Sequence, residues 1–184
     1  MTGAAITLRV MAEGPRAAVT ALMRSGTDPR LLLAPIGTGM VRAVQDRFRS
    51  ATDPQGAAWA PLNPEYAAAK KRGAGILRGA AMAGGLMGSI TRDVQGDEVA
   101  VGTAKVYGAP HQFGAVIRPR SAPALAFRIG KRLVLARSVT IPARPYLGWG
   151  PAEDEVVMEV TEAFFDRAIA AGQAAAVRQV GRLF

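Results

Sequence analysis

Cysteine is absent from the 184-residue sequence, and histidine occurs only once, at His111. Disulfides and thiolate metal sites are therefore excluded, and a zinc site with the usual ligands is not expected. No apolar run reaches the roughly 18 residues that indicate a transmembrane span. The first residues lack a charged segment followed by an apolar one, so we expect no secretory signal and synthesis in a cytoplasm.

Acidic residues are missing from one long stretch, because no Asp or Glu lies between Val99 and Ala152. Residues 101–150 carry +8 from eight basic and no acidic residues, whereas residues 151–184 carry −3 from three basic and six acidic residues. Such asymmetry indicates an acidic partner. This partner is either nucleic acid or, in a self-assembly, the acidic first turns of another subunit's C-terminal helix. Solubility alone is the plainest alternative.

Aromatic residues make up only 6% of the chain, although hydrophobic residues make up 49%. We expect a modest core with Ala-rich helices. Aromatics are too sparse among the basic residues for single-strand stacking, and no helix-turn-helix is recognisable. The sequence predicts one α+β domain over residues 1–184, with a small antiparallel sheet and packed helices. Its other parts are a protruding basic β-hairpin or loop arm (115–141), a C-terminal helix (151–171) and a tail (172–184).

Helical periodicity is clearest over residues 31–50, where apolar residues recur at three- and four-residue steps. Pro35 and Gly37 interrupt the beginning of this segment, so the alternative is a helix that starts near Thr38. The apolar face is formed by Leu33, Ile36, Met40, Val44 and Phe48.

Three other helices are expected. A short one covers residues 16–23, and another covers 64–71 with Asn63 as its candidate N-cap. The C-terminal helix begins at Pro151 with carboxylates in its first turn, which its dipole favours, and Gly172 is expected to end or bend it. The apolar side of this last helix is formed by Val156, Val157, Val160, Phe164 and Ile169.

Alternation of apolar and polar residues predicts two antiparallel hairpins. The first joins residues 89–94 to 98–102 through a Gly-containing turn. The second is the arm, which joins 115–127 to 132–141 with its tip at Gly130. Further extended segments are predicted at 5–10 and, as the beginning of a strand, at 86–90.

The sequence offers little catalytic chemistry. His111 stands near no nucleophile-elbow pattern, and no P-loop or dinucleotide-binding motif is present. The carboxylates at Asp53 and Asp97 suit turns rather than an acid pair. We therefore expect no active site, metal or cofactor. Trp59 is expected to pack a loop onto the domain, whereas for Trp149 packing and interface anchoring are equally favoured.

Two short signatures flank the basic stretch: YGAPHQFG at residues 107–114 and IPARPYLG at 141–148. Together with earlier pieces in the same order, they resemble the phage virion morphogenesis family, which includes the tail completion proteins of Mu-like and P2-like phages. The resemblance spans roughly residues 30–170. The earlier pieces are Arg47-Phe48, Asp53 to Gly56, Trp59 to Leu62, Tyr66, Lys70-Lys71, Ile76-Leu77, Gly84 with 86–90, and Val101-Gly102.

The resemblance implies a structural role rather than an enzymatic one. Such a protein completes the tail or neck of a contractile-tailed virion so that head and tail join. It would be assembled in the host bacterial cytoplasm and reside at the neck or tail end of the virion. The implied partners are further copies in a ring, with six subunits expected, neck, tail terminator or tail tube proteins, and packaged DNA in the channel. No membrane partner is implied.

Two sets of residues follow as candidates. The first consists of residues that would reach a partner: Arg118, Arg120, Arg128, Lys131, Arg132, Arg137, Arg144, Tyr146 and Trp149. The second consists of residues that would hold the signatures in place: Trp59, His111, Gln112, Phe113, Gly114, Pro142, Pro145, Leu147 and Gly148. The leading hypothesis is a joining protein of a phage or prophage. The alternative is a basic module that binds DNA non-specifically in the virion or during packaging.

Overall fold

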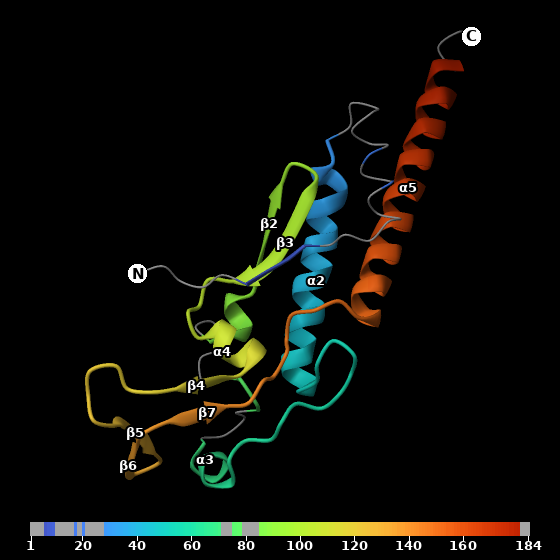
Figure 1. Ribbon diagram of the computed structural model, residues 1–184. Helices are drawn as coiled ribbons and strands as arrows, with labels where there is room; N and C mark the ends of the chain where they lie inside the picture. The colour runs from blue at the N-terminus through green and yellow to red at the C-terminus, as the bar shows by residue number, and fades with distance from the viewer. Residues whose placement is uncertain are drawn as a thin grey trace.

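The computed structural model describes residues 6–9, 17, 20, 28–70, 75–78 and 85–180, with only the backbone for 6–9 and 172–180. It is a mixed α+β fold, as the sequence predicted (Figure 1). No described helix is long and apolar enough to cross a membrane. Of the expected helix over 16–23, the structure describes only Ala17 and Thr20, and both are helical. The elements are β1 (Ile6–Arg9), α2 (Arg30–Ser50), α3 (Pro64–Ala69), the 3-10 helix η1 (Met87–Ser89), β2 (Thr91–Gln95), β3 (Glu98–Thr103), α4 (Gly108–Phe113), β4 (Ala115–Ile117), β5 (Leu125–Ile129), β6 (Arg132–Ala136), β7 (Val139–Ile141) and α5 (Pro151–Val180).

Helix α2 is the centre of the molecule, and its predicted apolar face is buried. The helix begins at Arg30 rather than near Thr38 and continues through Pro35, which lacks the backbone N–H for one hydrogen bond of the helix. Its glycines do not interrupt it either. A Cβ at Gly37 would lie 2.6 Å from Cγ2 of Val99, and one at Gly39 would lie 2.5 Å from Cγ1 of Val156. These glycines permit the sheet and α5 to approach α2 closely.

A three-stranded antiparallel sheet in the order β1-β3-β2 packs on one side of α2. The predicted hairpin of β2 and β3 is confirmed, and Gly96 in its turn has a φ of +60°. The strand expected near the N-terminus is also confirmed, since β1 pairs with the other edge of β3. Val99 and Val101 of β3 are buried in the core.

Two sequence predictions need correction. The segment 86–90, where we expected the beginning of a strand, contains the 3-10 helix η1, and buried Leu86 and Ile90 flank that helix. Helix α5 continues through Gly172, where we expected an end or a bend, and reaches Val180. Its first half packs along α2, while its second half extends beyond that helix (Figure 1).

The arm is a hairpin in two steps. Strand β4 pairs with β7 at its base, and β5 pairs with β6 towards its tip. The tip lies at Gly130, as expected, where a φ of +58° suits glycine. In Figure 1 the arm projects at the lower left, and α5 rises on the opposite side of the molecule.

Candidate interaction surface

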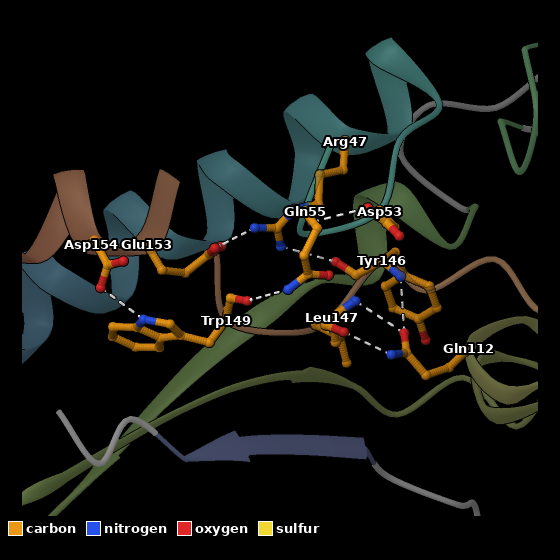
Figure 2. Close-up of polar contacts among 9 residues, drawn as sticks. All are labelled: Arg47, Asp53, Gln55, Gln112, Tyr146, Leu147, Trp149, Glu153 and Asp154. Atoms are coloured by element: carbon orange, nitrogen blue, oxygen red, sulfur yellow. Dashed lines mark hydrogen bonds and ion pairs between the residues drawn. The ribbon is translucent and has the colours of Figure 1, made fainter. Parts of the chain in front are cut away.

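Residues 142–150, called here the return segment, lead from β7 of the arm back to α5. Gln112 of α4 holds the middle of this segment (Figure 2). Its Oε1 accepts hydrogen bonds from the backbone N–H groups of Tyr146 and Leu147, both at 3.0 Å, and its Nε2 donates to the Leu147 carbonyl at 2.7 Å. Gln112 is buried, so these contacts fix the two signatures against each other.

The beginning of the return segment is attached to the loop after α2. The indole of Trp59 donates to the carbonyl oxygen of Pro145 at 2.8 Å. The guanidinium of Arg144 donates to the carbonyl oxygens of Ala60 and Pro61 at 2.8 and 2.9 Å. Burial lowers the pKa of Arg144. This arginine is therefore an internal tie and not part of the accessible basic surface.

Tyr146 is fully buried among aromatic side chains. Its ring centroid lies 5.2 Å from that of Phe48, which packs edge-to-face on Trp59 at 5.5 Å. Burial raises the pKa of Tyr146 to about 12. Tyr146, like Arg144, was an interface candidate in the sequence, and in the structure both lie in the interior.

The end of the return segment meets α2 and α5 (Figure 2). Arg47 of α2 donates to the carbonyl oxygen of Tyr146 at 3.3 Å and forms a buried ion pair with Glu153 of α5. The half-buried Trp149 donates from its indole to the carboxylate of Asp154 at 2.7 Å. Its backbone carbonyl accepts a hydrogen bond from Gln55 at 2.9 Å. Trp149 thus pins the segment to the first turn of α5.

The other residues assigned to the signatures divide between the interior and the surface. A Cβ at Gly148 would lie 2.5 Å from Pro54, and Gly114 has a φ of +77°. Pro142 is exposed, and the side chain of Phe113 is 70% exposed. We had expected Phe113 to hold the motif in place, but its side chain points away from the core because the helical turn of α4 buries its neighbour Gln112.

His111 is half-buried, and its ring lies 6.3 Å from that of Tyr107. Burial, and secondarily the positive charge of Arg144, lowers the pKa of the imidazole. His111 lines a hollow of about 850 Å³ between the arm and the body, and Lys70 and Arg78 line the same hollow. Within the described ranges, no group of three or more His, Asp or Glu side chains could hold a metal ion.

The arm carries much of the accessible positive charge. Six of the candidate basic residues are exposed there, and exposed apolar side chains accompany them. One ion pair ties the arm to the body, between Arg132 and Glu65 of α3 at 2.6 Å. The six basic residues are Arg118, Arg120, Arg128, Lys131, Arg132 and Arg137.

A second exposed surface was not found from the sequence. Met158, Phe165 and Ile169 of α5 are exposed, although we had assigned Ile169 to the side that faces the core. Their spacing of seven and four residues puts them on one line of the helix, and this spacing is visible in the sequence. Phe164, the neighbour of Phe165, packs against the core instead.

The model of the phage virion morphogenesis family matches residues 12–166. No curated protein and no solved structure matches significantly. The matched range contains both signatures, the arm and the first half of α5.

Proposed function

Because the matched range covers most of the chain, the protein belongs to the phage virion morphogenesis family and acts in virion assembly, and we propose that it completes the tail or neck of a contractile-tailed phage. In this role it would allow the filled head and the tail to join. Its place in the finished particle would be the neck or tail end, as part of a ring around the tail axis.

The observation that carries this proposal is the division between the signatures and the arm. The return segment is hydrogen-bonded to the body at residues 144–147 and 149. The arm, by contrast, leaves its basic side chains and some apolar ones, Leu133 and Leu135 among them, exposed. A return segment fixed to the body and an arm with exposed basic and apolar side chains suit a protein that connects other subunits.

Electron microscopy of particles assembled without this protein tests the proposal. We expect full heads beside separate tails, and joined particles again when the wild-type protein is supplied. Joined, infectious particles in the absence of the protein would overturn the joining role.

A second candidate function is non-specific DNA binding, which the six exposed arm cations favour. It predicts binding that weakens steeply with salt and is lost when Arg128, Lys131, Arg132 and Arg137 are reversed in charge. Unchanged DNA affinity in that variant, together with failed assembly, would leave the joining role alone.

We further propose that the protein is not an enzyme. His111 is the strongest catalytic candidate by residue type, yet its buried Nδ1 has no hydrogen-bond partner among the described residues, so no described side chain orients the imidazole as a base. His111→Ala is expected to leave infectivity unchanged, provided that the protein still folds. A loss of infectivity with normal folding and normal assembly would contradict this.

A further inference from the structure

Helix α5 has two apolar faces, and only one of them is covered. Val157 is buried against the core, whereas Met158, Phe165 and Ile169 are 61%, 38% and 58% exposed. At 100° per residue these three positions fall within about 40° of one another on the helix. Exposed apolar side chains aligned along a helix are typical of a surface that packs against another protein.

Carboxylates run along one edge of this apolar line. They are exposed, and none of them forms a salt bridge with another described residue. The uncovered face of α5 is therefore apolar with an acidic border. We call it the α5 face; its acidic members are Glu155, Glu159, Glu162 and Asp166.

The arm carries a surface of the opposite character. In β6, Leu133 and Leu135 are 56% and 67% exposed, and both lie on the same side of the hairpin as Arg128, the register partner of Leu133. Arg137 follows at the next alternate position of the chain. The other side of the hairpin bears Phe127 and Val134, which are less exposed. We call the first side the outer arm face.

We propose that the outer arm face of one subunit docks on the α5 face of a second copy of this chain, so that leucines meet the apolar line and arginines meet the acidic border. The dimensions agree. Leu133 and Leu135 lie about 7 Å apart along a strand. Phe165 and Ile169 lie about 6 Å apart along a helix.

A subunit cannot satisfy this contact with its own surfaces, because the arm and α5 lie on opposite sides of the molecule (Figure 1). Two different surfaces that complement each other make a head-to-tail interface, which closes into a ring when the rotation per subunit permits. The inference rests on the self-association in the proposed function and names its interface.

A protein partner explains the outer arm face better than DNA does. Phosphate contacts need only the arginines, and exposed Leu133 and Leu135 gain nothing from a hydrated backbone. Against the α5 face, the same leucines are removed from water while the arginines meet carboxylates.

Charge reversal on each surface tests this with the full-length protein. The arm variant is Arg128→Glu with Arg137→Glu, and the helix variant is Glu162→Lys with Asp166→Lys. The readout is the molar mass in solution across a concentration series. We expect each variant alone to weaken assembly at least tenfold and the combined four-residue variant to restore it. An equal mixture of the arm and helix variants should also assemble, with the two proteins in alternation.

Asp97→Lys serves as the control, because Asp97 is an exposed acid in the turn between β2 and β3. It should assemble like the wild type. A wild-type protein that stays monomeric would overturn the inference, as would a combined variant no better than its parents. An arm variant that loses DNA binding while assembling normally would assign the arm to DNA instead.

Particle microscopy separates this inference from the proposed function. If both single-surface variants support head–tail joining and assemble normally, the interface is wrong and the joining role stands. If particles join without the protein, the joining role fails even where charge reversal shows the interface to be right.

Discussion

At the scale of single residues, the amide of Gln112 satisfies three backbone groups of the return segment at once. A side chain of similar shape without hydrogen-bonding atoms would leave these buried groups unpaired. The adjacent residue, Phe113, has its ring largely in solvent. The two neighbours on α4 therefore give a matched pair for testing the role of the signature.

We predict that Gln112→Leu lowers the free energy of unfolding by about 2–4 kcal/mol, because unsatisfied buried polar groups cost about 1–3 kcal/mol each and partial relaxation recovers some of this. Phe113→Ala should change it by less than about 0.5 kcal/mol. Urea unfolding followed by circular dichroism measures both. Equal destabilisation by the two substitutions would contradict the assigned role of Gln112.

Because Tyr146 is buried, we predict that the free energy of unfolding depends on pH in the alkaline range. Burial raises the pKa of its hydroxyl to about 12 in the folded protein, above its ordinary value of about 10. The unfolded chain then loses the proton first and binds fewer protons than the folded chain. This contribution to stability is fully present below pH 10 and is lost as the pH rises towards 12.

Tyr146→Phe should make the unfolding midpoint less sensitive to pH between about 10 and 12, since it removes the titrating group. The hydroxyl has no hydrogen-bond partner among the described residues, so the substitution should cost little at pH 7. Tyr107→Phe, at an exposed position, is the control and should keep the wild-type slope. If the unfolding midpoint of Tyr146→Phe depends on pH as the wild-type midpoint does, a group other than Tyr146 causes the loss of stability at alkaline pH.

At the scale of secondary-structure elements, the contact between α2 and α5 depends on the absence of a side chain at Gly39. A Cβ there would lie 2.5 Å from Cγ1 of Val156, which is closer than carbon atoms pack. The buried ion pair of Arg47 and Glu153 joins the same two helices near the start of α5. The close approach and the ion pair together set the direction in which α5, and with it the α5 face, extends.

We predict that Gly39→Val lowers the free energy of unfolding by about 1–3 kcal/mol through overpacking, although valine has a better helix propensity than glycine. Adding Val156→Ala should recover part of this loss because it removes the opposing methyl groups. The free energies of the two single variants and the double variant, arranged as a cycle, measure the coupling. If the changes in free energy of the two single variants simply add up in the double variant, the side chains at positions 39 and 156 are not in contact.

At the scale of the whole molecule, the body and the arm are separable. The base of the arm is a pair of short strands in which Ile117 is the register partner of Val139. A two-residue Asn-Gly turn in place of residues 118–138 would close this pair as an ordinary hairpin. The one ion pair lost among the described residues, Arg132 with Glu65, is exposed and worth at most about 1 kcal/mol.

The armless variant is therefore expected to keep its helix content and to unfold at nearly the wild-type midpoint while failing to assemble. A control keeps the arm and changes only its tip, from Gly130-Lys131 to Asn-Gly, and should assemble normally. Circular dichroism and light scattering separate the two effects. Normal assembly without the arm would place the self-association surface elsewhere on the body.

The sequence by itself determined the elements whose signals are local. Periodicity gave the face of α2, and alternation with a glycine turn gave the β2–β3 hairpin and the arm. The N-cap was also readable: Asn63 accepts hydrogen bonds from the N–H groups of Glu65 and Tyr66, as expected. Each of these depends on residues within a few positions of one another, so the chain alone contains the information.

Only the tertiary structure decided which charged and aromatic residues are internal. Arg144 and Arg128 look alike in the sequence, but the carbonyls of Ala60 and Pro61 draw the first into the interior and leave the second on the arm. Likewise, the packing of α5 on α2 settled which of its apolar residues stay exposed. Both outcomes depend on contacts between segments far apart in the chain, which no local pattern specifies.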